Sequence, residues 1–336
     1  MVFGMRRREL IAAALLVGAG LAARPASAQA APLRIARPLD LVALPLVVMQ
    51  HEHLIERVAE SMGLGEVKIA WSAPAGDPLD ALAKGETDLA AAEVAPFLIA
   101  ADGDTPPQVH AIGALAQRPY VLVSRNRTIR TIRDFGPKDH IAVPALKTSG
   151  PALMLEMAAA QEWGPEHYDQ LDRFVVAQPD AAATDALLSG KGSIDAHFSR
   201  TPYADDELGD PKIHRVMDSF DIAGPHSVTV LATTMRLHER SPELCKAILA
   251  ALQSADDLIA KTPGAAAEMF AATVKDQDIP LEDLSDMIGD PDLAYRAAPA
   301  GIMRLAEFMH QVGRLKRQPA SWQDLFLPEA RDLKGD

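Results

Sequence analysis

The stretch DPLDALAKGETDLAAAEVAPFLIAAD, residues 77–102, predicts a helix, a buried strand and a second helix in direct succession. Asp77 is the expected N-cap of the first helix, and Pro78 suits its first turn. TDLAAAEV is a strand of small residues, and APFLIAAD is the second helix. A buried strand between two helices is typical of a parallel sheet that is covered by helices on both faces.

The same alternation extends along the chain. Residues 32–48 contain a strand and a turn, 44–65 a helix, and 66–74 the next strand. Residues 139–199 begin a second round of strands and helices, and the chain is mostly helical from Pro242 onward. This order predicts an α/β protein with two doubly wound lobes, a cleft between them and C-terminal helices. In open α/β sheets, ligands bind at the carboxyl ends of the strands.

The segment GSIDAHFSRTPY, residues 192–203, is expected to contain such a strand end. Residues 194–196 are the predicted strand, and His197, Ser199 and Tyr203 follow at its exit. This density of polar groups fits a catalytic corner, a metal site or the rim of a pocket. No G-x-S-x-G elbow occurs and no third group to orient a nucleophile is evident, so the rim of a pocket is favoured.

Composition limits the classes of function. The chain has 336 residues, 48% of them hydrophobic, which is enough for two domains with their own cores. The formal net charge is -13, with both signs interspersed, which argues against a nucleic-acid partner. The single cysteine, Cys245, allows no internal disulfide. No metal site is predicted, because His51 and His53 lie two residues apart and do not share a helix face.

The first residues indicate export. Arg6, Arg7 and Arg8 precede an apolar stretch over residues 10–23, and an A-x-A cleavage site ends at Ala28. We therefore expect a signal peptide over residues 1–28 and a periplasmic location. The order RRELI loosely fits a twin-arginine signal, and the general secretory route stays open.

Over residues 32–328 the chain resembles the solute-binding proteins of bacterial ABC importers, in the branch that binds nitrate, sulfonates, taurine and thiamine precursors. The likeness is carried by DALAKGETDLAAAEVAPFL, DHIAVPALKTSGPALML, ALLSGKGSIDAHFSRTPYADDEL with VMDSFDIAGPHSVTVLATT, and AYRAAPAGIMRLAEFMHQVGRLKRQPASWQDLF. It implies a type II periplasmic binding fold in which a hinge crosses between the lobes twice. Lobe 1 would comprise residues 32–118 and 227–336, and lobe 2 residues 119–226.

The resemblance also implies a monomer that captures a small molecule and delivers it to a membrane permease, with no cofactor and no catalysis. The expected solute is a sulfonate, an amino-sulfonate or a related organic acid. Two alternatives stay open. One is an enzyme on the same fold, similar to a thiamine-pyrimidine synthase, although such an enzyme would need a cysteine-rich stretch. The other is an accessory protein that senses a ligand.

The segment ALKTSGPALML, residues 145–155, predicts an anion-binding helix start. Pro151 suits the first helical position, with Ser149 or Gly150 as the cap. Because the next acidic residue is Glu156, the first N–H groups keep their partial positive charge, which suits a sulfonate or a carboxylate. Lys147 could add charge. The alternative is an ordinary helix start with solvated amides.

Glu93 would have the opposite preference, because a carboxylate at a strand exit repels a simple oxyanion and attracts an amine or another donor. Its alternative role is to cap the helix that begins near Pro96. If both predictions hold, the solute is a zwitterion or a polar organic acid. The residues expected to line the cleft are Leu41, Val42, Trp71, Glu93, Tyr120, Lys147, Thr148, Ser149, Gly150, His197, Ser199, Tyr203, His226 and Ser227. The alternative for His197 is an internal hydrogen bond, and for Trp71 a place in the core.

Overall fold

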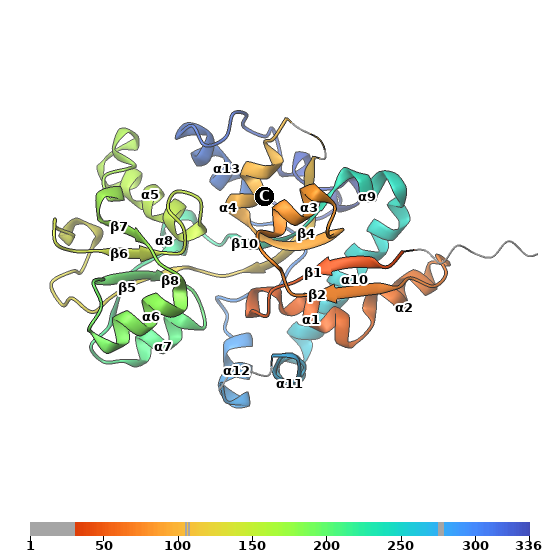
Figure 1. Ribbon diagram of the computed structural model, residues 1–336, viewed down its shortest axis with the longest axis horizontal. Helices are drawn as coiled ribbons and strands as arrows, with labels where there is room; N and C mark the ends of the chain where they lie inside the picture. Colours follow the sequence, from red (N-terminus) through yellow and green to blue (C-terminus); the bar gives the residue numbers. More distant parts are fainter. Residues whose placement is uncertain (1–30, 105, 107, 275–278) are drawn as a thin grey trace, which may run out of the picture. The chain divides into compact units, whose positions relative to one another are not determined.

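The computed structural model describes residues 31–104, 106, 108–274 and 279–336. The predicted signal peptide lies outside these residues. The described chain forms an α/β fold of two lobes, each built on its own five-stranded mixed sheet (Figure 1). The alternation of strands and helices predicted from the sequence is confirmed.

The first lobe contains the sheet β2-β1-β3-β10-β4. Strand β1 pairs in parallel with β2 and β3, as expected for strands joined by helices, whereas β10 pairs antiparallel with β3 and β4. The strands are β1 (Leu33–Ala36), β2 (Ile69–Ser72), β3 (Leu89–Glu93), β4 (Val109–Gln117) and β10 (Ser227–Thr234).

The helices of this lobe cover its sheet. They are α1 (Leu44–His51), α2 (Leu54–Ser61), α3 (Pro78–Lys84), α4 (Val94–Ala101), α9 (Met235–Arg240), α10 (Pro242–Lys261), α11 (Pro263–Thr273), α12 (Leu281–Ile288) and α13 (Ile302–Gln311). The helix predicted over residues 44–65 is divided into α1 and α2, because His53 adopts a left-handed φ of 50° between them. Gly113 in β4 lets α10 approach closely, since a Cβ there would lie 2.8 Å from Leu252.

The second lobe contains the sheet β7-β6-β8-β5-β9, with β6 parallel to β7 and β8, and β5 antiparallel to β8 and β9. Its strands are β5 (Val121–Ser124), β6 (Ile141–Val143), β7 (Val175–Ala177), β8 (Ala196–Ser199) and β9 (His214–Asp218). Its helices are α5 (Gly150–Trp163), α6 (Asp180–Ser189), α7 (Tyr203–Gly209) and α8 (Ser219–Ala223).

Short 3-10 turns complete both lobes. They are η1 (Leu41–Ala43), η2 (Ile132–Asp134), η3 (Pro165–His167), η4 (Asp172–Phe174), η5 (Trp322–Asp324) and η6 (Pro328–Ala330).

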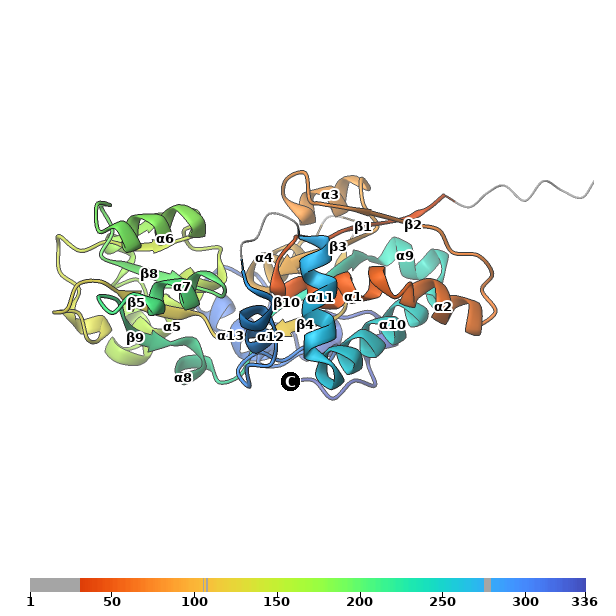
Figure 2. The same ribbon diagram turned by 90° about the horizontal axis from the view of Figure 1, so that it is seen from below.

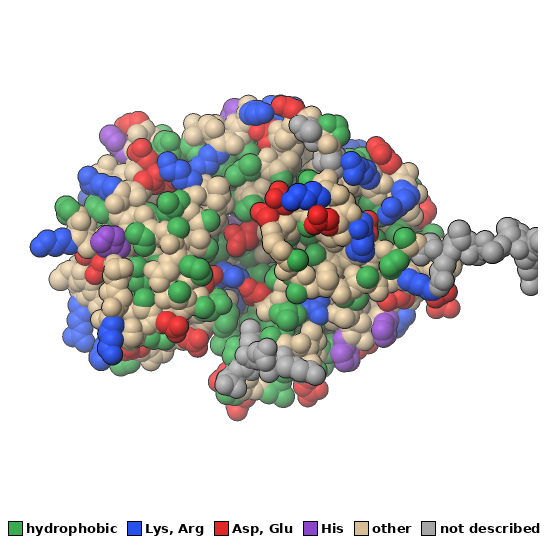
Figure 3. Space-filling view, viewed as in Figure 1, with side chains coloured by type: hydrophobic (Ala, Val, Ile, Leu, Met, Phe, Trp, Pro, Cys, Tyr) green, Lys and Arg blue, Asp and Glu red, His purple; other side chains and the backbone are tan. Residues whose placement is uncertain are grey.

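The chain passes between the two sheets twice, from β4 to β5 and from β9 through α8 to β10 (Figure 2). The boundaries predicted at residues 118/119 and 226/227 stay a prediction. The region after α12 also contacts the second lobe, because Arg314 forms an ion pair with the buried Glu156 of α5. The face shown in Figure 3 carries acidic and basic side chains interspersed. Within the described ranges, no helix combines the length and the apolar character needed to cross a membrane.

Candidate functional site

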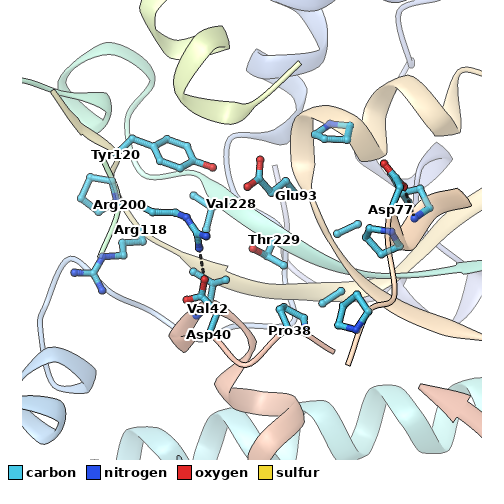
Figure 4. Close-up of a pocket in the computed structure, with 17 residues that line it drawn as sticks. Pro38, Asp40, Val42, Asp77, Glu93, Arg118, Tyr120, Arg200, Val228 and Thr229 are labelled. Carbon is cyan, nitrogen blue, oxygen red and sulfur yellow. Dashed lines mark hydrogen bonds and ion pairs between the residues drawn. The ribbon is translucent and has the colours of Figure 1, made fainter. Parts of the chain in front are cut away.

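A cavity of about 320 Å³ lies between the lobes (Figure 4). Its wall is largely apolar, with side chains of Val42, Leu79, Val228 and five prolines, Pro38, Pro74, Pro78, Pro96 and Pro119. Its charged lining residues are Asp40, Asp77, Glu93, Arg118 and Arg200. The volume is at the small end of the ~300–1,000 Å³ that is typical of ligand pockets.

Strand pairing places two of these carboxyl groups together. Glu93 is the last residue of β3, and Asp40 follows β1 as the N-cap of η1. Since β1 and β3 are parallel neighbours, their carboxyl ends meet at one edge of the sheet, and both residues reach the cavity there. Thr229 of β10 pairs with Glu93 across the antiparallel ladder and also lines the cavity.

Arg200 follows β8 in the second lobe and joins the two lobes electrostatically. Its Nε donates to Asp180 Oδ2 at 2.8 Å, and its Nη1 donates to Asp40 of the first lobe. Burial alone would lower the pKa of Arg200, but the nearby carboxylates, led by Asp40 and Asp180, raise it above its ordinary value. The guanidinium is therefore charged at every physiological pH.

Arg118 and Asp77 are also engaged by the protein. Arg118 lies in the first crossing, and its Nη2 is 3.5 Å from Asp205 of α7. In Figure 4 its guanidinium points away from Glu93. Asp77 caps α3, where its Oδ1 accepts from the backbone N–H groups of Leu79 and Asp80 at 2.8 and 3.0 Å.

Glu93 has the least protein support of the five. It forms no ion pair with any of the described residues. Burial raises the pKa of its carboxyl group, and Asp180 and Asp40 add to that rise, while Arg200 and the backbone N–H of Gly150 oppose it. The Tyr120 hydroxyl points toward the Glu93 carboxyl group (Figure 4).

Tyr120 and Gly150 fit closely together beside Glu93. A Cβ on Gly150 would overlap the Tyr120 hydroxyl, so only glycine allows the ring to lie against the start of α5. Burial raises the pKa of Tyr120 well above its ordinary value, and the neighbouring Glu93 raises it further. The phenol is therefore neutral and can donate a hydrogen bond.

Some of the site residues predicted from the sequence lie at the cavity, and others do not. Val42, Glu93 and Tyr120 line the cavity, and Gly150 lies beside it. Ser149 caps α5 as expected, with its Oγ accepting from the N–H of Ala152 at 3.4 Å and donating to the carbonyl of Ala145 at 2.7 Å. The exposed Lys147 lies 3.5 Å from Asp172, and Thr148 is also exposed.

The predicted end of the strand before His197 is wrong. Strand β8 runs Ala196–Ser199, so His197 and Ser199 lie inside it and are fully buried. His197 Nδ1 lies 2.6 Å from Glu207 Oε1, and its Nε2 lies 3.3 Å from Asp180 Oδ1. Burial lowers the pKa of His197, but hydrogen bonds to the two carboxylates more than offset this and raise it. His197 therefore makes internal hydrogen bonds, which was the alternative to a place at the rim of the pocket.

The other predicted residues lie around the cavity rather than among its lining residues. Tyr203 begins α7, and burial raises the pKa of its phenol while the charge of Arg200 opposes that rise. Leu41 is buried in η1, and Trp71 in β2 packs against the core with the guanidinium of Arg37 6.0 Å from its ring. His226 and Ser227 are buried at the second crossing, where Ser227 Oγ accepts from the N–H of Ala300 at 3.1 Å. Their role in binding stays a prediction.

Sequence reasoning missed Asp40, Arg118, Arg200 and the proline wall. Asp40 had the same signal as Glu93, a carboxyl group directly after a predicted strand, and could have been found. Arg200 lies in the quoted segment 192–203, but its pairing with a residue 160 positions earlier has no local signal.

Comparison with known proteins agrees with the architecture. No family model matches the chain, and no curated protein matches its sequence. Among solved structures, the periplasmic aliphatic sulphonate binding protein SsuA from Escherichia coli superposes with a TM-score of 0.67 at 18% identity, covering 88% of this chain and 92% of that one.

Two further solved structures show the same likeness. The alkanesulfonate-binding protein SsuA from Xanthomonas axonopodis pv. citri bound to MOPS has a TM-score of 0.65 at 18% identity, over 88% of this chain and 97% of that one. The periplasmic nitrate-binding protein NrtA from Synechocystis PCC 6803 has a TM-score of 0.63 at 14% identity, over 87% and 83%. The chain thus has the two-lobed fold of the periplasmic sulfonate- and nitrate-binding proteins of ABC transporters, as the sequence resemblance implied.

Proposed function

We propose that this protein is a periplasmic solute-binding protein of an ABC importer. The observation that carries the proposal is a single cavity with groups from both lobes, with Asp40 and Glu93 on one side and Arg200 on the other. A solute held there would contact both lobes at once, so its binding energy would favour the arrangement in which the lobes approach each other.

The solute we propose is a small polar organic molecule such as a sulfonate, an amino-sulfonate or a related organic acid. The apolar wall of prolines and valines would hold its carbon skeleton, and the polar groups at the strand ends would orient it. Val42, Glu93 and Tyr120 are the residues of the original prediction that we assign to direct contact, and Gly150 supports them through Tyr120.

Function then consists of capture and delivery without chemical change. We propose that the exported protein acts as a monomer in the periplasm and that the ligand-bound form docks on a membrane permease. We also propose that residues 32–118 and 227–336 move as one body relative to 119–226, with the two crossings as hinges.

Native mass spectrometry of freshly purified protein tests this function. We expect a bound species of a few hundred daltons or less that is released unchanged on denaturation. Adding the identified compound at 100 times its dissociation constant should stabilise the fold by about 2.7 kcal/mol. A protein that binds no small molecule from bacterial extracts, or that converts the bound compound to a product, would contradict the proposal.

A further inference from the structure

One carboxyl group of the cavity wall forms no ion pair with the described residues. Arg200 is paired with Asp40 and Asp180, Arg118 lies near Asp205, and Asp77 is used as a helix cap. Arg200 is thus compensated by two carboxylates, and Arg118 contacts one through Nη2, while its buried Nη1 has no partner among the described residues. Glu93 is the remaining charged lining residue, and no described cation pairs with it.

The start of α5, which the sequence predicts as an anion site, faces this same carboxyl group. The backbone N–H of Gly150 lies close enough to Glu93 to favour its charged form, so an acidic side chain of the first lobe occupies the position beside the helix start. An anionic group brought to that position would meet the Glu93 carboxylate. A simple oxyanion is therefore disfavoured at this end of the cavity.

A partly buried carboxyl group without a counter-ion is costly in its charged form, and a cationic ligand removes that cost. Of the neighbouring groups, Tyr120 is neutral, and Arg200 lowers the pKa of Glu93 from a distance while its guanidinium pairs with two other acids. We propose that the solute carries a protonated nitrogen or a similar compact cationic group, that Glu93 binds this group, and that Glu93 thereby sets the specificity of the site. This inference rests on the proposed function, and of the solutes proposed there it selects an amino-sulfonate over a plain sulfonate.

The proton balance of this contact gives an independent readout. Burial raises the pKa of Glu93, and Asp180 and Asp40 add to that rise, so near this pKa a cationic ligand must displace a proton. Binding of the cation therefore strengthens as pH rises through the pKa of Glu93, and it releases protons.

The test compares the thermal stabilisation of the full chain by four compounds of similar size and different charge. They are choline, its uncharged isostere 3,3-dimethylbutan-1-ol, the zwitterion taurine, and the anion ethanesulfonate. The same series is measured for Glu93→Gln and for Glu66→Gln, which makes the same substitution at an exposed glutamate that does not line the cavity. A bacterial small-molecule extract is screened in parallel by native mass spectrometry.

We expect choline or taurine to stabilise the wild type and Glu66→Gln, with about tenfold to hundredfold weaker binding to Glu93→Gln. Three results would overturn the inference and leave the proposed function standing. They are binding of ethanesulfonate or the alcohol alone, capture from the extract of a solute without a cationic group, and equal binding by Glu93→Gln. A protein that is stabilised by none of the four and captures nothing from the extract contradicts both. If none of the four compounds binds but the extract yields a solute, a cationic nitrogen in that solute and weaker binding to Glu93→Gln would support the inference. A solute without such a group, or one that binds equally to Glu93→Gln, would overturn it.

Discussion

Arg200 of the second lobe forms an ion pair with Asp40 of the first, across the cavity and over a separation of 160 residues. The same guanidinium is anchored within its own lobe by Asp180, which also contacts His197. The guanidinium, which is fixed in the second lobe, therefore pairs with a carboxylate that follows the carboxyl end of β1. The ion pair thus joins the two lobes at residues that also line the cavity.

Asp40→Asn should weaken this link without unfolding the protein. Asparagine can still cap η1, whose Val42 N–H is bonded by Asp40, but it gives Arg200 no charge to pair with. We expect small-angle X-ray scattering to show a larger radius of gyration for the ligand-free variant, and the affinity for the identified solute to fall by about tenfold.

Arg133→Gln is the matched control, since it breaks an exposed ion pair with Glu162 inside the second lobe. It should leave both the radius of gyration and the affinity unchanged. An Asp40→Asn protein with the dimensions and affinity of the wild type would show that the ion pair does not affect closure.

Gly150→Ala should destabilise the protein, because a methyl group there overlaps the Tyr120 hydroxyl. Overpacking of this kind costs about 1–3 kcal/mol, which urea denaturation can measure. Gly209→Ala is the control, as a Cβ at Gly209 has no neighbour within 4 Å. Equal stability of both variants would mean that Tyr120 is free to move away from α5.

Two of the predicted site residues illustrate what the sequence could reveal. Glu93 was identifiable because TDLAAAEV has the composition of a buried strand, and parallel strands bring their carboxyl ends to a ligand. His197 was misplaced because SIDAHFS alternates between polar and apolar residues throughout, so the pattern does not show where the strand ends. The strand ends three residues later than predicted, which places His197 inside β8 and not at the expected rim. The Asp40–Arg200 pair depends on how the lobes meet, which no local pattern encodes.

Asp256 should make the stability of the protein depend on pH. It is buried in α10, its Oδ1 has no partner among the described residues, and burial raises its pKa to about 8. The folded state therefore holds a proton that the unfolded chain loses near its ordinary pKa of about 4. The free energy of unfolding should fall as pH rises between about 4 and 8, and the loss is complete above the folded pKa.

Asp256→Asn removes this titration, so urea denaturation should show a shallower decline over that pH range and, at pH 8, a stability at least about 1 kcal/mol above the wild type. Asp257→Asn, at the neighbouring exposed position, should keep the pH dependence of the wild type. Parallel pH profiles for the wild type and Asp256→Asn would contradict the assignment.

The buried contacts of His197 with Glu207 and Asp180 predict a second pH effect, in which the free energy of unfolding again falls as pH rises. The pKa of His197 is raised above 6.5 in the folded protein, so the stability that its charged form gives is fully present below the unfolded pKa and is lost as pH rises through the folded pKa. His197→Gln should be less stable than the wild type at pH 6 by about 1–3 kcal/mol, and the difference should narrow toward pH 9. A difference that stays constant with pH would indicate a neutral histidine.

The most direct test is a crystal structure of the protein with the compound that co-purifies with it. We predict continuous density for one unmodified small molecule in the cavity, in contact with Glu93 of the first lobe and with groups of the second lobe. Density for that molecule at another site, or contacts to one lobe alone, would contradict capture between the lobes.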